Sequence, residues 1–133
     1  DASTVSSYSL APLALNVISP AVPTTESAAC WIITARNRRY AYTTNTGSGT
    51  LTGYRVSPST GALTRLDFDG VTGDLGAGAN PLDGAVSQDG KYMFVLSPAT
   101  GEIAVFFVRV DGSLEKLPSQ LGLPSTAFGL AAR

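Results

Sequence analysis

The sequence contains no histidine, and it has a single cysteine, Cys30. Without histidine, this chain supplies no imidazole for general-base catalysis, for activation of a nucleophile or for a zinc site. One cysteine excludes an internal disulfide and a paired-cysteine metal site. Because Cys30 lies between small and apolar residues, we expect a small buried hydrophobic residue rather than a reactive thiol.

Charged residues are also scarce. Lys and Arg total 9 and Asp and Glu total 10, so the net charge is -1. A nucleic-acid partner is not predicted, because the basic excess that attracts a phosphate backbone is missing. No apolar run approaches the ~20 residues that span a bilayer, so no membrane partner is predicted. The low charge and the abundance of Ser, Thr and Gly are typical of secreted β proteins, and we expect an extracellular protein.

The motifs of common cofactor sites are missing too. Residues 73–81, "GDLGAGANP", contain neither a GxGxxG pattern nor a phosphate-loop lysine, and no serine lies in a GxSxG context. The loop "DFDGVTGD", residues 67–74, holds three aspartates, but EF-hand spacing fails there. The sequence therefore predicts no cofactor and no metal.

An internal repeat is the main positive signal. "CWIITARNRRYAYTTNTGSGTLTGYRV", residues 30–56, aligns without gaps with "LDGAVSQDGKYMFVLSPATGEIAVFFV", residues 82–108, at an offset of 52. After a one-residue deletion, residues 61–66 align with residues 112–117. Self-similarity at a period of ~40 to 50 residues is typical of propellers and solenoids.

Each repeat is predicted to form four short strands. Val, Ile, Thr, Tyr and Phe are concentrated in runs separated by Gly, Asn, Asp, Pro and Ser, which is typical of strands and turns. The expected strands are 31–34, 40–45, 50–56 and 62–67, then 84–87, 92–97, 102–110 and 113–118. Each repeat is thus a four-stranded antiparallel meander, the blade of a β-propeller.

The two ends of the chain extend the pattern. "TVSSYSL" is similar to the third strand of a repeat, and "LPSTAFGLAAR" is similar to the first. The all-β chain is therefore divided into the outer strands of an incomplete blade (1–20), two blades (29–67 and 81–118) and the inner strand of a closing blade (123–133). Because blades need neighbours on both faces, we expect either the rest of a longer protein or self-association to complete the ring. The first residues indicate an excised end.

The residues resemble a known family. "RRYAYTTNTGSGTLTGYRV", "LDGAVSQDGKYMFVLSPATGEIAVF" and "DGSLEKL" are similar to the final blades of the lactonase-type seven-bladed propellers, which include 6-phosphogluconolactonases and 3-carboxymuconate lactonizing enzymes. The resemblance implies that the C-terminal strand closes a ring with an N-terminal part outside this chain. It also implies a His and a Glu at fixed spacing around the second strand. Those positions hold Trp31 and Thr46 in one repeat and Asp83 and Pro98 in the other.

The repeat places Trp31 and Asp83 near the central channel of a propeller. Trp31 is a candidate for stacking on a ring-shaped ligand, although a large aromatic also serves as packing material. Asp83 is a candidate general base or hydroxyl acceptor, although its carboxylate could equally bond the backbone of the "NPLDG" turn. Tyr8, Tyr54 and Phe106 recur at one position of the third strand, which predicts packing rather than catalysis.

Three arginines, Arg36, Arg38 and Arg39, form the remaining candidate site. They align with "QDGK", residues 88–91, which predicts an ordinary strand-connecting turn, while an anion site is the alternative. Arg36 is kept as a candidate catalytic residue beside Asp83. Two functions remain open: a lactonase-like enzyme acting on a lactone or a small carboxylated or sugar substrate, and a noncatalytic scaffold that binds a protein or a glycan.

Overall fold

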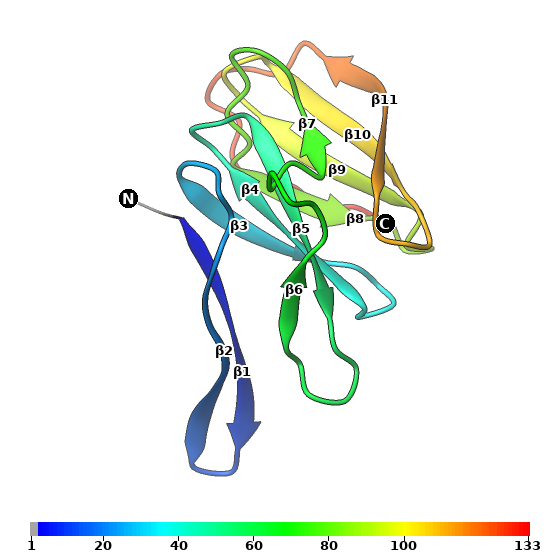
Figure 1. Cartoon of the computed structure of the whole chain (residues 1–133). Coiled ribbons are helices and arrows are strands. Elements are labelled where there is room, and N and C mark those ends of the chain that lie inside the picture. Colours follow the sequence, from blue (N-terminus) through cyan, green and yellow to red (C-terminus); the bar gives the residue numbers. More distant parts are fainter. Residues whose placement is uncertain (1–2) are drawn as a thin grey trace.

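The structure is a computed structural model that describes residues 3–133. Every regular element in this part of the chain is a β-strand, and all strand pairs are antiparallel (Figure 1). The strands are β1 (Thr4–Ala11), β2 (Ala14–Pro23), β3 (Ala29–Thr34), β4 (Tyr40–Asn45), β5 (Thr50–Val56), β6 (Leu63–Arg65), β7 (Gly73–Asp74), β8 (Asp83–Val86), β9 (Tyr92–Ser97), β10 (Glu102–Val108) and β11 (Leu114–Leu121). The predicted all-β fold is confirmed.

The two repeats form two equivalent sheets. Strands β3, β4, β5 and β6 lie side by side in chain order, and β8, β9, β10 and β11 do the same. Their registers agree at the offset of 52: Tyr40 pairs with Arg55, and Tyr92 pairs with Phe107. The outer strands also correspond once the one-residue deletion is allowed for, because Tyr54 pairs with Arg65 and Phe106 pairs with Lys116. The repeat in sequence is therefore a repeat in strand register, and each sheet is one blade.

The outermost strand of the first blade is interrupted. β6 pairs with the end of β5, and β7 pairs with its beginning, at Thr50 and Leu51. Residues 66–72 form a loop between them, and the exposed Phe68 lies in this loop. In the second blade a single strand, β11, follows β10 with one register shift. The sequence does not predict β7, because two residues carry no periodicity.

The hydrophobic core lies between the two blades. Alternate residues of each strand point to the shared face, which follows from the two-residue period of a strand. The first blade contributes Ile33, Tyr40, Tyr42 and Leu51, and the second contributes Met93, Val95, Ala104 and Phe106. The hydroxyls of Tyr40 and Tyr42 cross the interface and donate to the carbonyl oxygens of Val110 and Gly112, at 3.1 and 2.8 Å.

Glycine is required at one position of this interface. Gly112 has φ of 91°, and a Cβ atom there would lie 2.5 Å from the Tyr40 ring. A larger residue would therefore both strain the turn and displace the ring.

The N-terminal hairpin differs from the two blades. Strands β1 and β2 pair only with each other and project away from the sheets (Figure 1). Tyr8 is 49% exposed, whereas Tyr54 and Phe106, its counterparts in the repeat, are buried. The prediction that Tyr8 packs in a core is therefore wrong for this chain. The reason is physical: this hairpin has no inner strands beside it to cover the ring.

The C-terminal segment also differs from its prediction. Residues 122–133 contain no strand, although the inner strand of a further blade was expected within 123–133. The inner strand of a blade pairs with the second strand of the same blade, and the described residues include no such strand beside this segment. The segment instead packs against the outer face of the second blade, where Leu130 to Arg133 line a hollow with Phe94 and Ile103.

Candidate functional site

A hollow of about 360 Å³ lies where the two innermost strands begin. Strands β3 and β8 are neighbours across the blade interface, so their first residues meet. The hollow is lined by Cys30, Trp31, Leu82, Asp83, Phe128 and Gly129. The structure thus brings together two of the predicted site residues, Trp31 and Asp83.

A β-bulge positions Trp31. The register of β3 against β4 shifts between Ala29 and Ile32, so two residues are accommodated without regular pairing. The Trp31 backbone N–H donates to Thr44 Oγ1 at 3.0 Å, and Thr43 Oγ1 donates to the Trp31 carbonyl at 2.9 Å. These threonines replace the missing ladder bonds, and the indole remains 49% exposed at the hollow.

The same bulge corrects the expectation for Cys30. Its side chain is exposed and lines the hollow, where a buried hydrophobic residue was expected. The expectation depended on regular alternation along β3. The bulge breaks that alternation, so neighbouring side chains do not follow the simple inside and outside pattern.

Both carboxylate oxygens of Asp83 accept hydrogen bonds from the backbone. Oδ1 accepts from the N–H of Gly84 at 2.7 Å, and Oδ2 accepts from the N–H of Leu130 at 2.7 Å. The first bond is of the backbone type that the sequence analysis considered. The second bond was not foreseen, because it joins residues 47 positions apart. Each oxygen keeps a further lone pair, so the carboxylate can still accept from a ligand.

Arg36 does not belong to this hollow. It follows the end of β3, whereas Trp31 lies near its beginning, and five extended residues span about 16 Å. Arg36 lines a separate hollow of about 360 Å³ with Thr34, Ala35, Arg38 and Val86. Arg36 and Asp83, which were predicted to act together, therefore lie at separate hollows.

Thr46 and Pro98 occupy the other two positions that correspond to the family's His and Glu, and neither residue lines the hollow. Thr46 Oγ1 donates to the carbonyl oxygen of Pro81 at 2.8 Å, which connects the two blades. Pro98 is buried. Only Trp31 and Asp83 of this set reach the hollow.

Phe128 and Gly129 also line the hollow, and their presence there was not predicted from the sequence. Their segment was expected to be a strand, and no periodic signal indicates where a segment without regular structure lies. No group of three or more Cys, Asp or Glu side chains within residues 3–133 is arranged to hold a metal ion. In the same residues, none of the elements is a helix that could cross a membrane.

The comparison with protein families identifies the class of this protein. The family described as "Lactonase, 7-bladed beta-propeller" matches residues 2–128. The chain therefore belongs to the lactonase family of seven-bladed β-propellers. Comparison with curated protein sequences gives no match.

Solved structures share the fold. One is a protein of Bacteroides fragilis whose 6-phosphogluconolactonase activity is inferred, with a TM-score of 0.77, 19% identity and coverage of 92% of this chain and 34% of that one. A second, from Bacteroides uniformis and assigned in the same way, has a TM-score of 0.75, 18% identity and coverage of 92% and 35%. The periplasmic gluconolactonase of Pseudomonas aeruginosa has a TM-score of 0.71, 17% identity and coverage of 95% and 38%. The chain thus spans about a third of the length of these relatives.

Proposed function

We propose that this chain forms part of the substrate channel of a lactonase-type propeller located outside the cytoplasm. The hollow between β3 and β8 binds a lactone or a small carboxylated or sugar substrate. The observation that carries this proposal is the meeting of the half-exposed Trp31 indole and the Asp83 carboxylate at the ends of two inner strands. The low charge of the chain and the periplasmic location of one structural neighbour support the extracytoplasmic setting.

Each side chain has a defined task in this proposal. The indole offers a flat apolar face on which a sugar or lactone ring stacks. The Asp83 carboxylate accepts a hydrogen bond from a substrate hydroxyl or from the attacking water. Its bonds to Gly84 and Leu130 fix its orientation, because both come from the backbone.

Hydrolysis of a lactone then follows a balanced course. The oxygen of water bonds to the carbonyl carbon while Asp83 takes a proton from that water. The bond between the carbonyl carbon and the ring oxygen breaks, and the released alkoxide takes up a proton to give a hydroxy acid. Because this chain has no histidine, any imidazole that assists these transfers comes from other blades.

A noncatalytic binding role is the second candidate. It is favoured by the replacement of the family's His and Glu by Trp31 and Thr46 in one blade and by Asp83 and Pro98 in the other. In that case the same hollow binds a glycan or a protein loop through Trp31 and Asp83, and no bond is broken.

The test is a lactone panel assayed on the full-length protein and its Asp83→Asn and Trp31→Ala variants. We expect Asp83→Asn to lower kcat by about 10²- to 10⁴-fold, the usual contribution of a general base. Trp31→Ala is expected to raise KM with a smaller change in kcat. The matched control is Asp89→Asn, because Asp89 is exposed and lies in the turn after β8, whereas Asp83 is the first residue of that strand.

The outcomes separate the two functions. Unchanged turnover in Asp83→Asn would remove its catalytic role. A protein that is inert on the whole panel, yet binds a glycan more weakly after Trp31→Ala, would favour the noncatalytic role. Thermal unfolding of Asp83→Asn checks that loss of activity is not loss of the anchored C-terminal segment.

The partners of this chain are part of the same proposal. The outer face of the second blade carries Tyr92, Phe94, Ile103, Val105 and Phe107, which alternate with the buried residues of β9 and β10. The equivalent face of the first blade, with Tyr40, Tyr42 and Leu51, is buried by the second blade. Repetition of the contact calls for a further blade, from the same protein or another chain, or for a second copy.

A further inference from the structure

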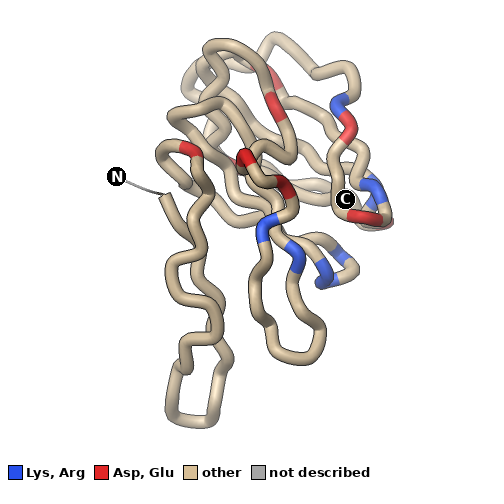
Figure 2. Tube along the Cα trace, viewed as in Figure 1, with Lys and Arg blue, Asp and Glu red and all other residues tan. Residues whose placement is uncertain are grey.

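The turn between β3 and β4 carries an unusual concentration of positive charge. Arg36, Arg38 and Arg39 lie in four consecutive positions, and all three side chains are exposed. Figure 2 shows Lys and Arg gathered on this turn and beside the nearby ends of β5 and β6. No carboxylate of the described residues forms an ion pair with any of the three arginines.

The equivalent turn of the second blade provides an internal comparison. Both turns close with the same backbone bonds: Arg38 N–H donates to Ala35, and Gly90 N–H donates to Ser87, each at 2.9 Å. In each turn, a side-chain oxygen also accepts a hydrogen bond from the backbone N–H two residues later. Asn37 Oδ1 accepts from Arg39 N–H at 2.9 Å, and Asp89 Oδ1 accepts from Lys91 N–H at 3.1 Å. The backbone design is therefore shared, and the differences lie in the side chains.

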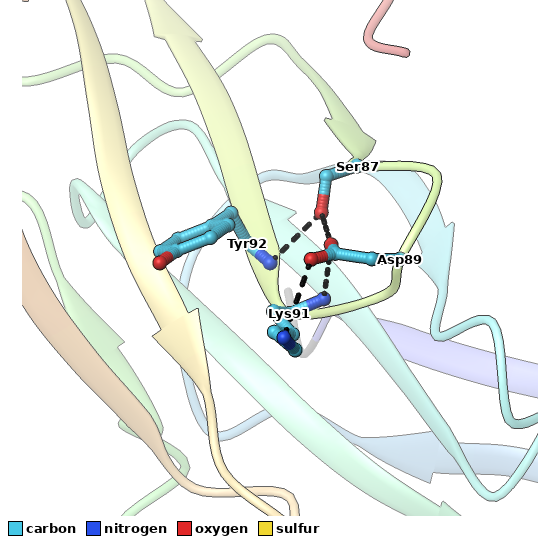
Figure 3. A network of polar contacts seen from close by, with 4 residues as sticks. All are labelled: Ser87, Asp89, Lys91 and Tyr92. Carbon is cyan, nitrogen blue, oxygen red and sulfur yellow. Dashed lines mark hydrogen bonds and ion pairs between the residues drawn. The ribbon is translucent and has the colours of Figure 1, made fainter.

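The second turn neutralises its own charge. Asp89 accepts a 2.6 Å hydrogen bond from Ser87 Oγ and lies 3.8 Å from Lys91 Nζ (Figure 3). The hydrogen bonds from Ser87 and from the Lys91 backbone hold the pKa of Asp89 below its ordinary value. Asn37 stands in place of Asp89, and Ala35 in place of Ser87, so the first turn keeps the cap but has no carboxylate.

The first turn also adopts a less favourable backbone conformation. Arg38 has φ of 56°, in the left-handed region, at the position where the second turn has Gly90 with φ of 74°. Glycine adopts that region without the steric cost that an arginine meets. Backbone strain of this kind gathers at sites where function requires a particular side chain.

The arginines border two hollows. Arg36 and Arg38 line the hollow of about 360 Å³ that Val86 closes. Arg39 and Arg55 line another of about 310 Å³ with Val56 and Pro58. The stem of Arg36 packs over the second turn, since a Cβ atom on Gly90 would lie 3.0 Å from Arg36 Cβ. Arg55 is held by the Tyr40 ring, 5.3 Å from its centroid, and donates to the Tyr40 hydroxyl at 3.3 Å.

We propose that the β3–β4 turn is a binding site for a compact polyanion that carries two or more phosphate groups. Unpaired guanidinium groups bind phosphate through two parallel N–H bonds, and three exposed arginines within four positions suit two linked phosphate groups. The site lies at the opposite end of β3 from the Trp31 and Asp83 hollow. It depends on none of the residues assigned to the proposed lactonase function.

The test is calorimetric titration of the full chain with pyrophosphate, and with inorganic phosphate at matched ionic strength. Pyrophosphate is expected to bind more tightly than phosphate, because its two phosphate groups can engage more than one of the three arginines. Arg36→Gln and Arg39→Gln should each weaken pyrophosphate binding by roughly fivefold, the loss expected for one exposed charge pair of about 1 kcal/mol. Asn37→Asp should weaken it similarly, because it restores the carboxylate of the second turn.

Arg38→Gly separates function from structure. The variant should raise Tm, since glycine relieves the left-handed strain, and it should nevertheless weaken pyrophosphate binding. The matched control is Arg109→Gln, because this exposed arginine already pairs with Glu115 at 2.6 Å and should leave binding unchanged.

Two results would overturn the proposal. One is pyrophosphate affinity that is the same in the Arg36, Arg38 and Arg39 variants as in the parent chain. The other is equal weakening by Arg109→Gln, which would show nonspecific charge attraction.

Discussion

The hydroxyl of Tyr42 donates a 2.8 Å hydrogen bond to the carbonyl oxygen of Gly112, a residue 70 positions later in the chain. This bond joins the two blades inside their shared core. Tyr54 is equally buried, but its hydroxyl has no hydrogen-bond partner among the described residues. The hydroxyl of Tyr42 therefore stabilises the folded chain, whereas the burial of the unpaired Tyr54 hydroxyl costs folding free energy.

Removal of these two hydroxyls should change stability in different directions. Tyr42→Phe leaves the buried carbonyl of Gly112 without its partner, and we expect a loss of about 1–3 kcal/mol in the free energy of unfolding. Tyr54→Phe removes an unpaired polar atom, and we expect it to be neutral or stabilising. Equilibrium unfolding in urea measures both. Equal losses in the two variants would contradict the assignment of the hydrogen bonds.

Alkaline pH should destabilise the chain through the same residues. Burial raises the pKa of Tyr54 from 10.0 to about 12, with Arg65 acting in the opposite direction. Burial also raises the pKa of Tyr42, and the nearby Tyr40 and Asp111 add to the effect. Both groups bind their protons more tightly when folded. Their contribution is complete below about pH 10 and falls as the pH rises, and the contribution of Tyr54 is lost as the pH passes about 12.

The measurement is the urea midpoint as a function of pH. The parent chain should lose stability between about pH 10 and 12, and Tyr54→Phe should reduce the slope in that range. An unchanged slope in this variant would show that Tyr54 does not contribute to the alkaline loss.

Substitution of Gly112 should be costly. Gly112→Ala places a Cβ atom 2.5 Å from the Tyr40 ring at φ of 91°. Steric overlap and left-handed backbone together should lower the free energy of unfolding by about 2–4 kcal/mol.

The control for Gly112→Ala is Gly78→Ala. Gly78 has φ of 80°, and a Cβ atom there has no neighbour within 4 Å. Only the backbone cost of about 1–2 kcal/mol should remain. Thermal unfolding of the two variants separates the contact from the conformation, and equal effects would mean that the Tyr40 ring moves aside freely.

The isolated chain should self-associate. The outer face of the second blade exposes apolar side chains, among them Tyr92 and Phe107, whose rings meet edge to face at 5.8 Å. Light scattering should therefore report species larger than one chain, and Phe107→Lys should reduce their share. Phe68→Lys is the control, since Phe68 lies in an exposed loop away from this face. A dilute monomer that unfolds cooperatively would contradict this expectation.

Sequence reasoning was most successful where side chains repeat. The alignment of Tyr40 with Tyr92 and of Tyr54 with Phe106 predicted strands whose registers agree in the structure. It could not predict the bulge at Cys30 and Trp31, because a bulge is one added residue with no distinct side-chain pattern. It also could not predict the bond between Asp83 and Leu130, because an irregular segment leaves no periodic trace. Sequence reasoning therefore named Trp31 and Asp83, which line the hollow, but it joined Arg36 to them and did not name Phe128 and Gly129.

The interruption between β6 and β7 has a practical consequence. The loop at residues 66–72 leaves the outermost edge of the first blade and returns to it, so the inner three strands pair without it. Phe68 projects almost wholly into solvent at its tip. The loop backbone is held, because the carbonyl oxygens of Phe68 and Asp69 accept hydrogen bonds from Arg65 and Thr25 at 2.7 and 2.6 Å. A fluorescent label carried on the side chain at position 68 would therefore report on ring assembly while leaving this backbone in place.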